Sequence, residues 1–428
     1  MKRLLLAVIL LCSPLYATTR HVVASGGVTT GTAADSSHGW TLSWALSSSN
    51  STLSAGDTVY IHAGTYAGMF LATKSGTNGS PIIYRAMPGQ RVTIDSGSPF
   101  NGNYTLGVNA SYVWFWGLEI MSSATTKSGG DETYGQYSWP DNIGQPEGIV
   151  TWPTDGTVDI PGIKIIRCII HDTRQGFSHW SGAWNSEVTD CVFFDNGWTD
   201  AQNNGRGHNW YIQTRSMKGT VKFTNNIDER SYGEAFQLYG SGGTTYGDST
   251  YFLKNFFSED GSAYPAHTGR NGLIRPGNVG NDDFYQNNVS YSDMQINLLV
   301  ASDGAGVGLN RFTMTNNLMF GAGADLTLTN YTGTPTITGN KAYSTENYSS
   351  TFSNNLWSTS KPSTWDTVVI HPFTYEKGAH IAVLNTAGLT SKAIDFSGFL
   401  SNGDKYTVVD AQNYYGTHSP RGRILAGL

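Results

Sequence analysis

The sequence is poor in charge, in cysteine and in long hydrophobic runs. Charged residues make up 14% of the 428 residues and three residues are cysteine. No apolar run approaches the ~20 residues that a membrane span needs. Lysine and arginine number 26 against 32 aspartate and glutamate, which leaves no basic surface for nucleic acid. We therefore expect a protein that binds neither membrane nor nucleic acid.

Several catalytic motifs are also missing. The chain has no closely spaced cysteine pairs for zinc, no phosphate-binding Gly-Lys-Ser/Thr loop and no G-x-S-x-G elbow. Metalloenzyme, nucleotide-binding and serine-esterase classes therefore have no support. We expect no metal and no cofactor, except that calcium is possible if the protein is a polysaccharide lyase.

The first residues have the pattern of a secretory signal peptide. Lys2 and Arg3 precede an apolar run over residues 4 to 11, and the small residue Ala17 offers a cleavage point. We predict that residues 1–17 are removed and that the mature protein is secreted or periplasmic.

Glycine and alternating apolar residues predict an all-β chain. There are 51 glycines, and segments such as Gly56 to Gly68 and Ser80 to Asp95 alternate apolar with polar residues between turn residues. A short helix is expected near Trp40 to Leu46. These features indicate many short strands joined by turns.

One marker position recurs along the middle of the chain, each time just before a short apolar run. From Cys168 onward the markers are 23, 35, 29, 33, 29, 23 and 15 residues apart. A solenoid coil needs roughly 20 residues, so the excess predicts loops inserted on one side. The column comprises Gly117, Cys168, Cys191, Asn226, Asn255, Asn288, Asn317, Asn340 and Asn355.

The asparagines of this column are predicted to be structural. Their side-chain amides can satisfy buried backbone groups from one coil to the next. Cys168 and Cys191 occupy the same position in adjacent coils, at a spacing that permits either a disulfide or two stacked small side chains.

The segment GDTVYIHAGTYAG and the later motifs GHNWYIQT and EAFQLYG resemble secreted bacterial proteins of the pectate-lyase-like superfamily. The resemblance implies a right-handed parallel β-helix over residues 18–360, a long insertion at 122–159 and a C-terminal β appendage or cap at 361–428. It also implies a polysaccharide partner and a monomer. The motifs specify a fold and no single reaction.

A second strand in each coil supplies the expected binding face. Alternation of side chains along a strand turns polar and aromatic residues outward there, and His179 inward. Aromatic rings stack on sugars, although the two tryptophans of the strip are equally well explained as core beneath the insertion. The predicted substrate-binding residues are Trp152, Trp180, Tyr211, Gln213, Gln237, Tyr239 and Arg275.

Glycoside hydrolysis is the leading prediction for the reaction. It needs two carboxyl groups about 5 Å apart for retention or about 6.5–9.5 Å apart for inversion. Asp195 and Glu234 are the predicted pair and Asp172 is third, with Glu147 and Asp200 in flanking loops. The alternative for each of them is a turn carboxylate that caps backbone N–H groups.

A polysaccharide lyase is the alternative enzyme. It would remove a proton next to a uronate carboxylate with His208, Tyr211 or Tyr239, and neutralise that carboxylate with Arg275 or with calcium. No compact aspartate cluster predicts a calcium site, and the low number of basic residues favours the hydrolase. A non-catalytic glycan-binding protein is the third reading.

Overall fold

A computed structural model describes the chain from residue 17 onward. The described residues are 17–97, 104–124, 126–130, 145–153, 157–200, 204–214, 218–239, 247–258, 260, 270–275, 282–292, 296–300, 309–321, 324–328, 333–343, 348–360, 362–364, 366–385, 387–415 and 421–423. The predicted signal peptide lies, apart from Ala17, outside them.

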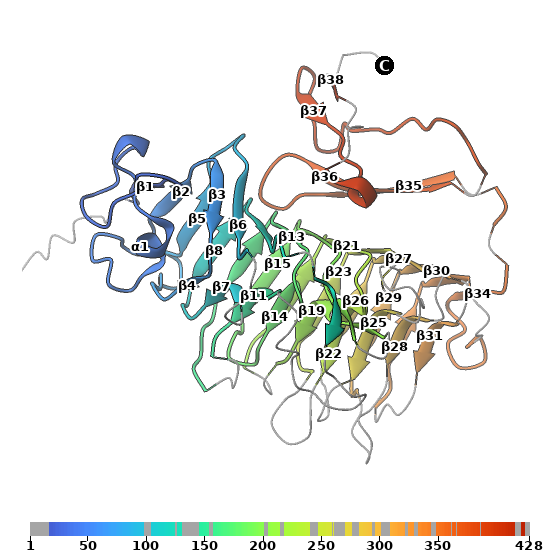
Figure 1. The fold of residues 1–428 in the computed structure, drawn as a ribbon. Helices are drawn as coiled ribbons and strands as arrows, with labels where there is room; N and C mark the ends of the chain where they lie inside the picture. The colour runs from blue at the N-terminus through green and yellow to red at the C-terminus, as the bar shows by residue number, and fades with distance from the viewer. Residues whose placement is uncertain are drawn as a thin grey trace, which may run out of the picture.

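Three long sheets of parallel strands wind along one axis, so the chain is a parallel β-helix (Figure 1). We call them sheets A, B and C in the order in which each coil passes through them. The predicted fold is confirmed.

Sheet A comprises β1 (Thr19–Val22), β2 (Thr58–Ile61), β5 (Ile82–Ala86), β8 (Val113–Trp116), β12 (Lys164–Ile166), β15 (Ser186–Thr189), β20 (Val221–Thr224), β23 (Thr250–Leu253), β26 (Phe284–Gln286), β29 (Thr313–Thr315) and β32 (Thr336–Thr338). Sheet B comprises β3 (Gly64–Ala67), β6 (Val92–Asp95), β9 (Glu119–Met121), β13 (Ile169–His171), β16 (Val192–Phe194), β21 (Ile227–Glu229), β24 (Phe256–Ser258), β27 (Val289–Ser292), β30 (Leu318–Gly321), β33 (Lys341–Tyr343) and β34 (Leu356–Ser358). Sheet C comprises β4 (Phe70–Ala72), β7 (Tyr104–Val108), β11 (Glu147–Thr151), β14 (Phe177–His179), β19 (His208–Ile212), β22 (Glu234–Tyr239), β25 (Arg270–Arg275), β28 (Ile296–Val300) and β31 (Ala324–Leu328).

The remaining elements are short. They are η1 (Ser36–His38), α1 (Leu42–Leu46), β10 (Ser128–Gly130), β17 (Trp198–Asp200), β18 (Gly205–Arg206), β35 (Asp366–Pro372), β36 (Ala379–Asn385), β37 (Lys405–Thr407), η2 (Ala411–Asn413) and β38 (Arg421–Arg423). Strands β10, β17 and β18 form a small sheet of their own.

Aromatic side chains stack through the core because equivalent positions of successive coils lie one strand spacing apart. Trp210 is paired in register with Phe236, and both are fully buried. The ring centroids of Trp210 and Phe236 lie 6.1 Å apart, and those of Phe223 and Phe252, which are partners in sheet A, lie 5.8 Å apart. The alternation predicted for these strands therefore places the expected residues inside.

The marker column lies at the turn from sheet A to sheet B, the A–B corner. Each asparagine from Asn226 to Asn355 accepts, through Oδ1, a hydrogen bond from the backbone N–H of the marker one coil earlier, at 2.8 or 2.9 Å. Cys168 and Cys191 are buried free thiols, and the N–H of Cys168 donates to Sγ of Cys191 at 3.3 Å. We call this column of hydrogen bonds the asparagine ladder. The two cysteines continue it as stacked residues, without a disulfide.

A second, shorter column occupies the turn from sheet B to sheet C, the B–C corner. Oδ1 of Asn196 accepts from the N–H of Thr173 at 3.0 Å, and Oδ1 of Asp260 accepts from the N–H of Ser231 at 2.9 Å. These residues differ in type from coil to coil, so the sequence pattern did not reveal the column.

Helix α1 closes the first coils, as the sequence predicts. Its residues Leu42, Ala45 and Leu46 are buried, and the Oγ1 of Thr41 accepts a hydrogen bond from the N–H of Trp44 at its N-terminus. The hydroxyl of Tyr84 donates to the carbonyl of Ala45 at 3.0 Å, which ties the helix to sheet A.

The C-terminal appendage lies along the outer face of sheet B, above the solenoid in Figure 1. Its antiparallel hairpin β35–β36 brings Val369 and Leu384 against Phe256 and Phe320. Nδ2 of Asn225 donates to the carbonyls of His371 and Pro372, each at 3.2 Å. These contacts lie along the side of the coils, which is the position of an appendage, one of the two arrangements predicted from the sequence.

Candidate functional site

Two residues predicted from the sequence contact each other at the N-terminal ends of neighbouring strands in sheet C, which we call the sheet C edge. His208 and Glu234 are partners in the register of β19 and β22, and Nδ1 of His208 lies 2.9 Å from Oε2 of Glu234. Their side chains are 15% and 14% exposed, so the pair is sheltered but open to solvent. An imidazole held against a carboxylate is a group that can accept and return a proton.

Aromatic residues lie beside this pair on sheet C. The ring of Tyr211 is 6.2 Å from that of His208 and 5.4 Å from that of Trp180, measured between centroids. Nε2 of Gln213 donates to the hydroxyl of Tyr211 at 2.9 Å. Trp180 is half-buried. Four of the predicted residues are thus brought together beside Glu234.

The other predicted binding residues extend the face in both directions. Trp152 is half-buried, with its ring centroid 5.8 Å from that of Tyr104. Gln237 pairs in register with Tyr211, and Tyr239 pairs with Arg275. The backbone of Arg275 belongs to β25, while its side chain lies outside the described part of the chain. The roles of these residues stay predictions.

Two other residues named from the sequence are buried. Nε2 of His179 lies 2.7 Å from Oγ of Ser186 in the core, where burial lowers the pKa of the histidine to about 4. This confirms its inward orientation. Glu147 begins β11, accepts a hydrogen bond from Ser178 and lies 3.7 Å from Arg174. Burial raises the pKa of Glu147 despite the charge of Arg174.

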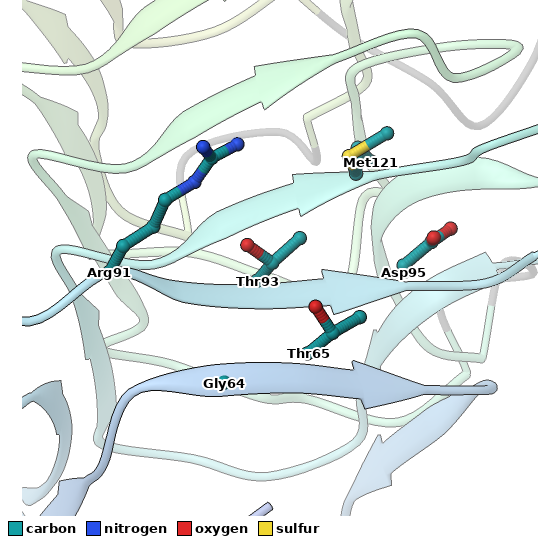
Figure 2. Close-up of a pocket in the computed structure, with 6 residues that line it drawn as sticks. All are labelled: Gly64, Thr65, Arg91, Thr93, Asp95 and Met121. Carbon is teal, nitrogen blue, oxygen red and sulfur yellow. The ribbon is translucent and has the colours of Figure 1, made fainter.

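An open pocket on the outer face of sheet B was not predicted. Figure 2 shows that its lining comes from the consecutive strands β3, β6 and β9 and the residue before β6. Its volume is about 370 Å³. The lining residues are Gly64, Thr65, Arg91, Thr93, Asp95 and Met121.

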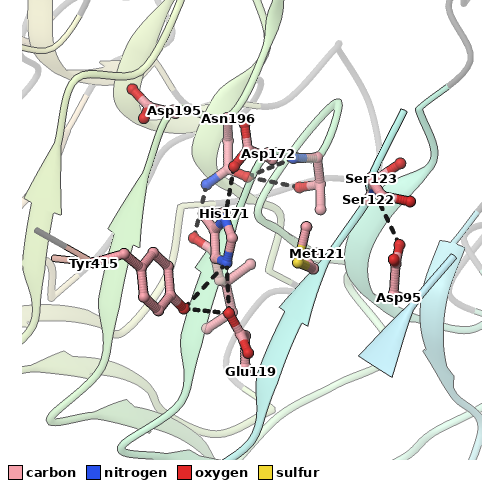
Figure 3. Close-up of polar contacts among 12 residues, drawn as sticks. Asp95, Glu119, Met121, Ser122, Ser123, His171, Asp172, Asp195, Asn196 and Tyr415 are labelled. Atoms are coloured by element: carbon pink, nitrogen blue, oxygen red, sulfur yellow. Dashed lines mark hydrogen bonds and ion pairs between the residues drawn. The ribbon is translucent and has the colours of Figure 1, made fainter. Parts of the chain in front are cut away.

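A charged network borders this pocket (Figure 3). Nε and Nη2 of Arg91 donate to the two carboxylate oxygens of Glu119 at 2.7 and 2.6 Å. Nε2 of His171 lies 3.1 Å from Glu119, and the hydroxyl of Tyr415 donates to the same carboxylate. Burial alone would raise the pKa of Glu119, but these hydrogen bonds hold it well below its usual range. The alternation of β13 places His171 outward, which is the one sequence signal that could have located this network.

Asp172 and Asp195 belong to the same side of the molecule. Asp172 pairs with Lys127 and with Nδ1 of His171, which lies 2.7 Å from its carboxylate. Burial acts to raise the pKa of Asp172, yet His171 and Lys127 outweigh it and the pKa is lowered. Asp195 lies 3.0 Å from Nη2 of Arg230, and its own pKa is raised because burial exceeds the effect of Arg230.

The predicted carboxylate pair is therefore divided between two networks. Asp195 directly follows β16 of sheet B and is paired with Arg230, whereas Glu234 begins β22 of sheet C and is paired with His208. The turn of the B–C corner lies between these strands. Asp200 is also engaged, because its carboxylate accepts from Arg206 and Asn204.

The described residues contain no cluster of three histidine, cysteine, aspartate or glutamate side chains that could hold a metal ion. Within the described part of the chain, no helix is long and apolar enough to span a membrane.

No family model and no curated protein matches the chain. Among solved structures it is similar to pectate lyase Pel9A, with a TM-score of 0.51, 16% identity, and coverage of 76% of this chain and 80% of the other. It is also similar to a rhamnogalacturonan lyase, with a TM-score of 0.54, 17% identity, and coverage of 72% and 75%. These likenesses confirm the predicted right-handed parallel β-helix.

Proposed function

We propose that the protein is a secreted polysaccharide-degrading enzyme and that it cleaves a uronate-containing glycan by β-elimination at the start of sheet C. The observation that carries this is the 2.9 Å contact between His208 and Glu234, with Tyr211 beside it. Both solved structures cited above are lyases by name. The proposal reverses the order of the two reactions predicted from the sequence.

In the proposed reaction, His208 is the base and Tyr211 is the acid. Nε2 of His208 removes the proton from the carbon next to the uronate carboxylate, and the carboxylate of Glu234, 2.9 Å from Nδ1, stabilises the imidazolium that forms. The electron pair left on that carbon forms the new double bond while the bond to the glycosidic oxygen breaks. That oxygen takes a proton from the hydroxyl of Tyr211, whose orientation Gln213 fixes through its hydrogen bond of 2.9 Å.

Binding of the glycan is assigned to the same face. Trp180 and Tyr211 offer aromatic rings on which sugar rings can stack, and Gln213 and Gln237 offer amides. Arg275, whose backbone pairs with that of Tyr239, is the candidate that neutralises the uronate carboxylate.

Calcium does not fit the described residues at this edge. The ion takes six to eight oxygen ligands, mostly from carboxylates and carbonyls, and no three candidate ligand side chains converge among the residues described. We therefore derive no step through calcium.

Hydrolysis is the second candidate, favoured by the raised pKa of Glu147, which suits a general acid. Strand β11, which Glu147 begins, is three strands from β22, which Glu234 begins, so their backbones are separated by about 14 Å at ~4.8 Å per strand. Hydrolases place their carboxyl groups about 5 to 9.5 Å apart. This separation argues against Glu147 and Glu234 as a hydrolase pair.

Product analysis tests the proposal directly. The full chain is incubated with a panel of uronate-containing and neutral polysaccharides, and reducing ends and ultraviolet absorbance are followed together. Elimination gives both signals in equal amounts, because each cleavage creates one unsaturated uronate. New reducing ends without absorbance would establish hydrolysis and reject the proposed reaction.

Single substitutions test whether the reaction takes place at the sheet C edge, where His208 and Glu234 lie. His208→Ala should lower the rate about 10²- to 10⁴-fold, the usual contribution of a general base, with an unchanged circular-dichroism spectrum. His38→Ala is the matched control, because that histidine is 76% exposed in η1. Full activity of His208→Ala would show that the active site does not lie at the sheet C edge.

A further inference from the structure

The outer face of sheet B has two unlike parts. From β21 onward it carries apolar side chains such as Phe256, Val289 and Phe320, which the appendage covers. Over β3, β6 and β9 it carries Thr65, Thr93 and other polar groups instead, and a pocket of about 370 Å³ opens there. Its volume reaches the lower end of the range for sites that bind small molecules, about 300–1,000 Å³, but the pocket is open rather than enclosed.

The pocket holds its polar groups in fixed positions. Oδ1 of Asp95 accepts hydrogen bonds from the N–H groups of Gly97 and Ser123 at 2.8 and 2.9 Å. Its Oδ2 accepts none from the described residues. At the opposite end, shown in Figure 2, Arg91 is anchored to Glu119 through Nε and Nη2 and is 63% exposed. Its Nη1 is not used in that pair.

The charges of the pocket select the class of ligand. Glu119 neutralises Arg91, and Asp95 adds one negative charge, so the pocket does not attract an anion. A carboxylate acceptor, a guanidinium donor and the exposed hydroxyl of Thr65 together match neighbouring hydroxyl groups of a sugar ring. Met121 supplies an apolar contact for its C–H groups.

We propose that this pocket, which we call the sheet B pocket, is an accessory binding site for a neutral sugar unit of a glycan. It is separate from the sheet C edge and does not depend on the reaction assigned there. Tyr415, 47% exposed and bound to Glu119, places the C-terminal appendage at its border.

Calorimetric titration of the full chain tests the proposal with defined probes. These are tetrasaccharides of xylose, glucose, galactose and mannose, compared with a tetrasaccharide of galacturonate. Thr65→Trp fills the pocket, and Thr65→Val removes one hydroxyl. Thr336→Trp is the matched control, because Thr336 is an exposed threonine of β32 on sheet A.

We expect at least one neutral tetrasaccharide to bind at millimolar concentration or below, with affinity abolished by Thr65→Trp and unchanged by Thr336→Trp. Thr65→Val should weaken binding about two- to tenfold, the range for one neutral hydrogen bond. Binding that survives Thr65→Trp, binding of the galacturonate probe alone through Thr65, or no binding of any neutral probe would each overturn the proposal. Cleavage activity of Thr65→Trp, measured in parallel, should stay at the wild-type level.

Discussion

At both the A–B and the B–C corner, side-chain oxygens accept hydrogen bonds from backbone N–H groups of the preceding coil, but the residues that do so differ. At the A–B corner one asparagine per coil caps the coil before it, from Asn226 to Asn355, with distances that vary by 0.1 Å. At the B–C corner the corresponding column passes through Asn196, Ser231 and Asp260, and the turns there differ in length. The uniform corner carries the continuous ladder of hydrogen bonds, and the varied corner borders the residues that we propose transfer protons.

The largest difference between the corners is expected in catalysis. Glu234→Gln should lower activity about 10²- to 10⁴-fold, because the amide no longer stabilises the protonated imidazole of His208. Asp195→Asn should change activity less than about threefold, since its carboxylate pairs with Arg230. Initial rates on the cleaved glycan measure both. A larger loss in Asp195→Asn than in Glu234→Gln would contradict the assignment to His208 and Glu234 and favour a catalytic role for Asp195.

Among the predicted effects on the free energy of unfolding, the largest is expected for substitutions in the asparagine ladder. The side chain of Asn255 accepts from the N–H of Asn226, donates to the carbonyl of Phe223 at 2.9 Å and is fully buried. Asn255→Ala leaves these two backbone groups unsatisfied and should cost about 2–6 kcal/mol in the free energy of unfolding, at about 1–3 kcal/mol per group. Urea titration measures it. The control is Asn354→Ala, which changes an exposed asparagine and should lower the free energy of unfolding by less than about 0.5 kcal/mol. Equal losses in the two variants would contradict a structural role for the ladder.

A buried carboxyl pair gives the B–C corner a pH dependence. Burial and the neighbouring Asp260 raise the pKa of Asp228, which also accepts a hydrogen bond from Asn209. The folded protein thus holds a proton that the unfolded chain releases near pH ~4. This contribution to stability is fully present below that pH and is lost as pH rises toward the raised pKa.

Asp228→Asn should therefore lessen the decline in stability with rising pH, by up to about 1.4 kcal/mol per pH unit. Melting temperatures between pH 4 and 9 measure the slope. Asp395→Asn is the control of opposite sign, because a hydrogen bond from the backbone of Ser397 lowers the pKa of this exposed aspartate. An unchanged slope in Asp228→Asn would show that the pair holds no extra proton.

The smallest effect is expected at the start of the ladder. Cys168 and Cys191 are unbonded, so a reducing agent should leave the melting temperature unchanged. Cys168→Ala should cost about 1 kcal/mol, the transfer free energy of a small buried group. A loss of about 2–5 kcal/mol on reduction, typical of a broken native disulfide, would contradict the stacked arrangement.

The same contrast explains what the sequence could predict. The ladder repeats one residue type at one position, and sheet C alternates, so the markers and the inward Trp210 and Phe236 were predictable. His208 and Glu234 were both named, but their contact depends on the register of two strands that follow turns of different length. The network around Glu119 was missed because its partners Arg91, His171 and Tyr415 come from separate coils and from the appendage.

The appendage changes the order in which this molecule can complete its fold. Ladder contacts join residues 15 to 35 positions apart, so each coil can form on the one before it. The bond between Tyr415 and Glu119 joins residues 296 positions apart, and that between Tyr375 and Lys164 joins residues 211 positions apart. Because these bonds need Tyr375 and Tyr415, the early coils cannot make them until those residues have been synthesised. A chain truncated before Asp366, the first residue of β35, would keep its coils but expose the apolar side of sheet B, making it a target for proteolysis.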